Sequence, residues 1–265
     1  LPTKSEQTDL LAAMYGRHVE APVPVLAAAT PGDCFYIVIE AFRLALKFMT
    51  PVIVLSDGGL ANASEPWKIP DENKLPNLKP DFHTEKNNFS PYHRNQQTLA
   101  RNWAIPGTPG LEHRLGGLEK DSFTGEISYE PENHERMVFL RDEKIKRIKN
   151  DLPPLEIIGP EKNDILVLTW GSVYGPAFSA VEELLKQGHP VSMVHLRHLN
   201  PFQKNLKEIL KNFEKVLVPE MNLGQLSLLL RAEFLIDTIP FAKVQGRPFL
   251  ISEIYNRVLA LLAEK

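Results

Sequence analysis

The residues best placed for chemistry in the first half of the chain follow an apolar run. Ser56-Asp57-Gly58 ends that run, and Asn87-Asn88 follows after 28 intervening residues. Asp and Asn side chains supply the hard oxygen ligands that could bind Mg²⁺ together with a diphosphate. Loops that bind Mg²⁺ and a diphosphate in this way have the pattern Gly-Asp-Gly…Asn-Asn, and Ser56 replaces the first glycine of that pattern. The proline-rich spacer also disfavours the helix whose N-terminus would face the phosphates. We therefore interpret Asp57 as part of a turn that ends a strand, and predict no metal site.

A second polar turn lies between a predicted strand and a predicted helix. It reads Gly171-Ser172-x-x-Gly175-Pro176, and backbone amides there could hold an anion. The turn lacks the glycine spacing of a dinucleotide fingerprint and the lysine of a phosphate loop. A tight crossover turn is the favoured interpretation. A free-standing nucleotide-binding protein that uses residues 171–175 stays as a weaker alternative.

Histidine and cysteine do not form a recognisable catalytic or metal motif. The eight histidines are scattered along the chain, without an H-E-x-x-H motif. Cys34 is the only cysteine, so the chain alone can build neither a disulfide nor a four-cysteine iron–sulfur cluster. We interpret Cys34 as a small buried residue rather than a reactive thiol. The residues by themselves predict no catalytic constellation in this chain.

Length and charge narrow the class of protein. The chain has 265 residues, 43% of them hydrophobic, which supports a real core and excludes a disordered chain. Its net charge of −3 gives no excess of positive charge that would bind nucleic acid or an anionic membrane, so neither is expected as a partner. No apolar run approaches the ~20 residues of a membrane span. We expect a cytoplasmic protein.

Alternating helix and strand patterns in the first part predict α/β architecture. We expect a helix over residues 5–17 with Ser5 as N-cap, and a strand over 24–29. A core-facing helix is predicted over 34–49, with Val38 and Phe42 among its apolar positions. The apolar run 51–55 predicts a strand buried on both faces of a parallel sheet.

The middle of the chain loses this periodicity. Eight of the 22 prolines fall between Pro51 and Pro109, which excludes mostly regular helix there. The aromatic residues of segment 60–129 indicate that it is pinned to the protein or to a partner. A charged helix is predicted over 133–150. Residues 151–160 then form the expected linker between a first domain, 1–150, and a second, 161–265.

The second domain repeats strand and helix. Strands are predicted over 164–169, 191–195 and 215–218, with a possible last strand over 241–244. Helices are predicted after the turn at residues 171–176, over 223–236 and over 251–263. This alternation predicts a three-layer α/β domain.

Four groups of residues carry a resemblance to a known family. The chain resembles the alpha subunit of 2-oxoacid:ferredoxin oxidoreductases, and is most similar to the 2-oxoglutarate type. The strings that carry this resemblance are Leu1-Pro-Thr-Lys-Ser-Glu-Gln7 with Tyr15-Gly-Arg-His18; Met49-Thr-Pro-Val-Ile-Val-Leu-Ser-Asp-Gly58 with Ala61-Asn-Ala-Ser-Glu-Pro-Trp67; Trp103-Ala-Ile-Pro-Gly-Thr-Pro-Gly-Leu-Glu-His113 with Gly116-Gly-Leu-Glu119; and Pro219-Glu-Met-Asn-Leu-Gly-Gln-Leu226.

The resemblance implies a fold and a set of partners. Residues 1–150 would be the C-terminal part of a domain that binds the pyrimidine half of thiamine diphosphate, and 161–265 a transketolase C-terminal-like domain. Thiamine diphosphate and Mg²⁺ would be shared with a beta subunit, which alone would carry the iron–sulfur cluster. Ferredoxin, CoA and a 2-oxoacid would be the further partners, in an oligomeric assembly.

The resemblance also points to residues near the cofactor cleft. These are Thr3, which would follow the family's Gly-Pro-Ser-Thr-Gly loop, and Gln7, Arg17 and His18. Their alternative roles are structural: a helix entry for Thr3, a helix-face residue for Gln7, and charges at a helix C-terminus for Arg17 and His18. The chain would be an inactive C-terminal part of the alpha subunit. The alternative function is a non-enzymatic assembly or dimerisation module whose segment 60–129 binds a partner.

Overall fold

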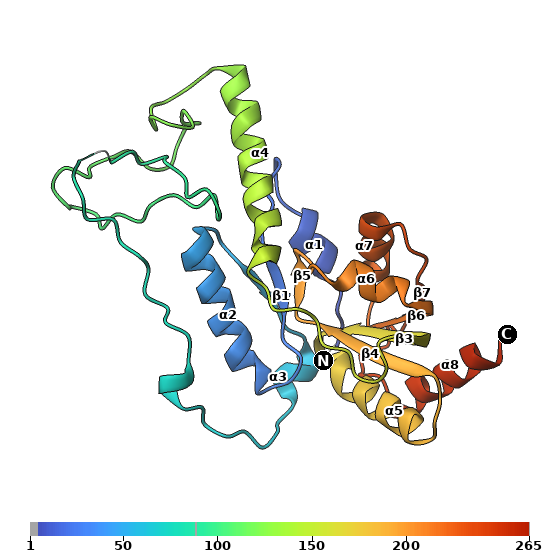
Figure 1. Ribbon diagram of the computed structural model, residues 1–265. Helices are drawn as coiled ribbons and strands as arrows, with labels where there is room; N and C mark the ends of the chain where they lie inside the picture. The colour runs from blue at the N-terminus through green and yellow to red at the C-terminus, as the bar shows by residue number, and fades with distance from the viewer. Residues whose placement is uncertain (1–4, 88, 265) are drawn as a thin grey trace.

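Two β-sheets organise the chain, as the alternating patterns predict (Figure 1). The computed structural model describes residues 5–87 and 89–264. The first sheet has the order β2-β1-β5, formed by Ile53–Leu55, Val25–Ala27 and His198–Asn200. The second sheet has the order β4-β3-β6-β7, formed by Val191–Leu196, Asn163–Trp170, Phe213–Glu220 and Ile239–Ala242.

The second sheet is covered on both faces. Side chains of a strand alternate between faces, so Ile165 and Val167 of β3 point to one side and Leu166 and Leu168 to the other. Helices α5 (Tyr174–Lys186) and α8 (Ile251–Ala263) cover the first of these faces. The opposite face is covered by α1 (Leu10–Tyr15), α6 (Leu206–Lys211) and α7 (Gln225–Phe234). The predicted three-layer α/β arrangement is therefore confirmed.

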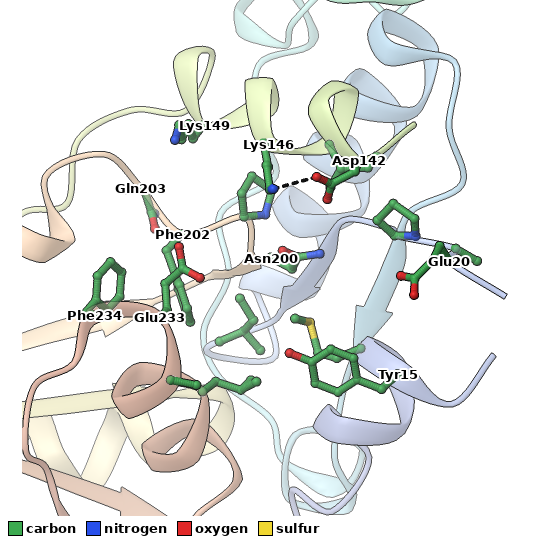
Figure 2. Close-up of a pocket in the computed structure, with 18 of the residues that line it drawn as sticks. Tyr15, Glu20, Asp142, Lys146, Lys149, Asn200, Phe202, Gln203, Glu233 and Phe234 are labelled. Carbon is green, nitrogen blue, oxygen red and sulfur yellow. Dashed lines mark ion pairs between the residues drawn. The ribbon is translucent and has the colours of Figure 1, made fainter. Parts of the chain in front are cut away.

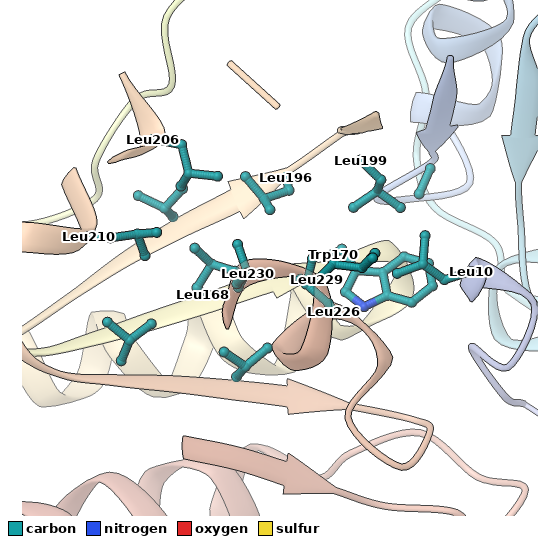
Figure 3. Packing of buried hydrophobic residues seen from close by; sticks show 14 of the residues in the cluster. Leu10, Leu168, Trp170, Leu196, Leu199, Leu206, Leu210, Leu226, Leu229 and Leu230 are labelled. Carbon is teal, nitrogen blue, oxygen red and sulfur yellow. The ribbon is translucent and has the colours of Figure 1, made fainter. Parts of the chain in front are cut away.

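The N-terminal helix α1 packs on this second sheet rather than standing apart from it. Leu10 is fully buried and lies beside Trp170 at the end of β3 (Figure 3). The expected helix over 5–17 is too long, and Ser5 is not its N-cap, because α1 begins only at Leu10. Residues 5–7 run outside regular structure because the Gln7 backbone N–H donates to the Met221 carbonyl at 3.1 Å.

The first sheet lies between two apolar clusters. Val25 and Ala27 of β1 face the core around α1, whereas Leu26 faces α2 (Asp33–Phe48) and α4 (Pro131–Arg147). Strand β1 is parallel to β2, as the expected parallel sheet requires. Its antiparallel pairing with β5 was not predicted from the sequence. The predicted full burial of β2 is wrong, since β2 is a half-buried edge strand.

Helix α2 buries only one side. Ile37, Leu44 and Phe48 are buried, whereas Val38 and Phe42, expected in the core, are 44% and 56% exposed. The apolar positions of α2 run almost around the helix, and the sheet with α4 covers only part of that circumference.

The segment between α3 (Gly58–Asn62) and α4 is largely irregular, as predicted. It runs out beside α2 and returns to the start of α4 (Figure 1), with η1 (Glu72–Lys74) as its short helical turn. The Trp103 indole N–H donates to the Leu46 carbonyl of α2 at 2.8 Å, which pins the segment. The helix expected over 133–150 is α4 followed by η2 (Ile148–Asn150). Within residues 5–87 and 89–264, no helix is long and apolar enough to cross a membrane.

Candidate functional site

The carboxyl ends of three strands meet at a small polar pocket. Ser56 and Asp57 follow β2, Ala28 follows β1 and Gly171 follows β3, while residues 6–9 close the pocket from the side. Ligands of α/β proteins bind at the carboxyl ends of parallel strands, so a functional site is expected at this edge. The pocket has a volume of about 20 Å³, which is room for about one water molecule.

Gln7 clamps the N-terminal segment onto the second sheet. Its side-chain Nε2 donates to the Trp170 carbonyl at 2.7 Å, and its Oε1 accepts from the Met221 backbone N–H at 2.9 Å. Gln7 is only 4% exposed. Gly171 has a φ of +61°, and a Cβ there would lie 2.5 Å from Gln7 Nε2, so a side chain at 171 would collide with the clamp. The turn predicted at Gly171 is therefore packed against Gln7.

A buried carboxylate, Glu220, supports the same network from the end of β6. It accepts hydrogen bonds from the Leu226 N–H at 2.7 Å, the Ser227 N–H at 3.0 Å and the Asn222 amide at 3.1 Å. The Asn222 amide also donates to the Gln7 carbonyl at 2.8 Å. Burial raises the pKa of Glu220, against the opposing effect of its hydrogen bonds. Sequence reasoning did not single out Glu220, because only its burial distinguishes it from a surface acid.

Asp57 has the structural role that its sequence context favours. Its carboxylate accepts from the Gly59 N–H at 2.7 Å and the Leu60 N–H at 3.2 Å, which caps the start of α3. Asn87 lies in the loop and is exposed, and Asn88 lies outside the described residues. In the described ranges, no three His, Cys, Asp or Glu side chains gather as metal ligands.

Of the other residues singled out by resemblance, Arg17 and His18 do not line the pocket of Gln7. Thr3 lies outside the described residues. Arg17 donates to the carbonyls of Met14 and Ala21 at 3.0 and 2.8 Å, so it satisfies backbone groups at the end of α1. His18 follows Arg17 and is exposed.

Arg17 borders a second, much larger cavity. This groove of about 1040 Å³ runs between α1, α4, the segment after β5 and α7, and Figure 2 shows it. Phe202 and Phe234 form an aromatic pair in it, with ring centroids 5.6 Å apart. Lys146 on its α4 side is paired with Asp142 at 2.6 Å. The groove is therefore separate from the strand ends where Gln7 and Asp57 lie.

Neither Cys34 nor His195 offers a reactive group. Burial, with Asp33 and Asp57 nearby, raises the pKa of the half-buried Cys34 thiol, which disfavours the nucleophilic thiolate. His195 on β4 shares a 2.8 Å hydrogen bond with the Thr169 hydroxyl. Burial, with Arg197 nearby, lowers the pKa of His195 to about 3, so this imidazole stays neutral.

Two family models match the chain. Residues 1–130 match the model described as "Pyruvate flavodoxin/ferredoxin oxidoreductase, thiamine diP-bdg". Residues 163–246 match "Pyruvate:ferredoxin oxidoreductase core domain II". The two matches lie on either side of α4 and the segment that follows it.

Curated proteins and a solved structure match nearly the whole chain. It is 51% identical over 264 residues to the 2-oxoglutarate oxidoreductase subunit KorA of Mycobacterium tuberculosis, covering 99% of this chain and 40% of that protein. It is 32% identical over 273 residues to 2-oxoacid:ferredoxin oxidoreductase 1, subunit alpha, of Aeropyrum pernix, covering 42% of that protein. The chain thus spans about two fifths of the length of these relatives.

The solved structure is a 2-oxoglutarate:ferredoxin oxidoreductase from Magnetococcus marinus with 2-oxoglutarate, coenzyme A and succinyl-CoA bound. Its chain matches with a TM-score of 0.93 at 33% identity, over 99% of this chain and 46% of that one.

The first family model names thiamine diphosphate, and the pocket at the strand ends does not by itself enclose it. The pocket at the strand ends has room for about one water. The Asp57 carboxylate next to it is already occupied in capping α3. A cofactor site at these strand ends therefore needs protein groups beyond the residues that line this pocket.

Proposed function

This chain belongs to the 2-oxoacid:ferredoxin oxidoreductase family as an alpha-subunit sequence, and we propose that it works in an enzyme of the 2-oxoglutarate type. The observation that carries the proposal is the 51% identity, over 264 residues, to a 2-oxoglutarate oxidoreductase subunit. The proposed reaction converts 2-oxoglutarate, CoA and oxidised ferredoxin to succinyl-CoA, CO₂ and reduced ferredoxin. Two electrons leave the substrate and reduce ferredoxin one at a time.

We propose that a beta subunit completes the active site. In this division of labour, thiamine diphosphate and Mg²⁺ lie between the two subunits, and the iron–sulfur cluster belongs to the beta subunit. The small volume of the pocket at the strand ends supports a cofactor site shared with another chain. The single cysteine supports a cluster held elsewhere, because such clusters are held by several thiolates.

Within this division, the chain's own residues shape one wall of the cleft. Hydrogen bonds of Gln7, Asn222 and Glu220 hold the N-terminal segment against the carboxyl ends of the strands, and residues 6–9 of that segment line the pocket there. We assign Gln7 a positioning role, through the backbone it fixes. Thr3, Arg17 and His18 remain candidates for residues near the cleft. The proposed domains are 1–150 and 161–265, joined by 151–160, and the two family matches support them.

Reconstitution tests the proposed function. The alpha-subunit polypeptide that contains this chain, mixed with its beta subunit and thiamine diphosphate, should reduce ferredoxin only when both 2-oxoglutarate and CoA are present. Ferredoxin reduction is followed by absorbance, and succinyl-CoA by mass spectrometry. The chain without the beta subunit should show no turnover. Turnover by the chain alone would overturn the proposal, as would a reconstituted complex that forms but oxidises no 2-oxoacid.

A further inference from the structure

Four cations gather where a hairpin packs on α4. Arg94 and Arg101 are paired across an antiparallel bridge, and the Asn95 N–H donates to the Ala100 carbonyl at 2.9 Å inside that turn. Arg94 Nη2 lies 3.8 Å from the sulfur of Met137 on α4. Residues spaced by four and seven lie on one face of a helix, so Arg141 and Lys144 share the face of Met137. We call Arg94, Arg101, Arg141 and Lys144 the basic cluster.

The basic cluster has little negative charge to balance it. Within the described ranges, the carboxylate that contacts it is Glu119, 3.4 Å from Arg141 Nη1, and Glu119 also pairs with His134 at 2.8 Å. The other hydrogen bonds go to neutral carbonyls: Lys144 Nζ donates to Met49 at 2.9 Å, Arg101 to Pro91 at 3.3 Å, and Arg94 Nη1 to Leu99 at 2.9 Å.

Arg94 is the least satisfied member of the cluster. Its Nε is buried and has no hydrogen-bond partner among the described residues, and one of its two remaining nitrogens meets only a thioether sulfur. Burial, with Arg94, Arg101 and Arg141 nearby, lowers the pKa of Lys144 to about 8. Like charges that lie opposite each other, as Arg94 and Arg101 do, destabilise a β-bridge. An anionic partner would therefore stabilise the basic cluster.

Apolar side chains surround this charge. Segment 115–129 touches the cluster through Glu119, and also through Gly125, which packs on the Tyr92 ring beneath Arg101. The same segment exposes five large apolar side chains. They are Leu115, Leu118, Phe123, Ile127 and Tyr129, between 37% and 81% exposed. Arginines among exposed aromatic and apolar side chains are typical of a protein interface, whereas a site for a free phosphate needs only the charge.

We propose that hairpin 94–101, segment 115–129 and the Met137 face of α4 form a docking surface for a partner chain whose carboxylates pair with the basic cluster. Apolar side chains of that partner would cover segment 115–129. On the proposed function, on which this step of the inference rests, the partner is the beta subunit. Arginine suits this role because its planar fork binds a carboxylate with two parallel hydrogen bonds.

The test removes charge from the surface and measures binding of the beta subunit. The complete alpha polypeptide is made as wild type, as R94Q/R101Q and as the matched control K162Q/K211Q, whose two lysines are exposed elsewhere. Titration calorimetry at several salt concentrations gives the Kd for the beta subunit. We expect R94Q/R101Q to bind at least about tenfold more weakly at low salt and to lose much of the salt dependence. The control should stay within about twofold of wild type.

Thermal unfolding separates docking from folding. R94Q/R101Q removes like-charge repulsion and also the hydrogen bonds of Arg94 to Leu99 and of Arg101 to Pro91, so its Tm should stay within a few degrees of the wild-type value. A wild-type alpha subunit that does not bind the beta subunit would overturn the proposed function, and this inference with it. Tight wild-type binding that R94Q/R101Q leaves unchanged would overturn only this inference. Phosphate binding gives a third outcome. If inorganic phosphate raised the Tm above its value in chloride at equal ionic strength, and yet did not weaken binding of the beta subunit, this inference would also be overturned.

Discussion

Replacing Gln7 with Ala should lower the free energy of unfolding, because it removes both side-chain hydrogen bonds that hold the N-terminal segment to the second sheet. The Trp170 carbonyl would lose the Nε2 donor at 2.7 Å, and the Met221 N–H would lose the Oε1 acceptor at 2.9 Å. A buried backbone group left without a partner costs about 1–3 kcal/mol. Because Gln7 is 4% exposed, water does not readily replace it. We expect a loss of about 3 kcal/mol in the free energy of unfolding.

That loss is large enough to measure without ambiguity. In a chain of this size, about 3 kcal/mol corresponds to a fall in Tm of about 6–10 °C. Urea unfolding followed by tryptophan fluorescence and by circular dichroism gives the free energy, and the slope with urea checks that the transition stays two-state.

Two further variants make the Gln7 test specific. Gln97 is exposed, so Gln97→Ala should change the free energy of unfolding by less than about 0.5 kcal/mol. Gln7→Glu keeps an acceptor for Met221 and loses the donor for Trp170, so it should also destabilise the chain. A cost below about 1 kcal/mol for Gln7→Ala would refute the clamp, since water would then serve both backbone groups equally well.

Three other predictions concern single side chains. Because the pKa of His195 is about 3 when folded and about 6.5 when unfolded, acid favours the unfolded chain. Stability should fall by about 2 kcal/mol between pH 7 and pH 5, and urea unfolding of His195→Gln should show a smaller fall. Asp57→Ala should lose the cap of α3 and about 1 kcal/mol of stability, whereas Asp57→Asn should keep the cap. If Mg²⁺ raised the Tm of wild type but not that of Asp57→Ala, Asp57 would instead belong to a metal site. Trp103→Phe should lose the hydrogen bond to Leu46 and speed proteolysis within residues 60–129; unchanged cleavage would mean that this contact does not pin the segment.

The local patterns of the sequence predicted most of the second sheet. The helix expected over 251–263 is α8, and the strand expected over 164–169 is β3 with one residue more at each end. Such patterns are reliable where apolar side chains repeat with the period of the element that buries them. The interpretation of Asp57 as a turn residue was also sound, because a short acid after a strand caps the next helix through backbone groups two and three residues away.

Predictions failed where the partner lies far along the chain. The antiparallel neighbour of β1 is β5, some 170 residues later in the chain. No local sequence pattern predicts that pairing. The same distance explains Ser5. The local pattern favours an N-cap there, but the bonds of Gln7 to Trp170 and Met221 hold the segment outside the helix instead.

The sequence by itself determined the α/β class, the irregular segment 60–129 and the family to which the chain belongs, because these depend on composition, local periodicity and specific strings of residues. Only the tertiary structure decided which polar residues matter together. It brought Gln7, Trp170 and Glu220 into one buried network, and it placed Arg94 of the hairpin near Lys144 of α4. The physical reason is that burial and charge balance arise between residues distant in sequence, and neither quantity exists until the chain has folded.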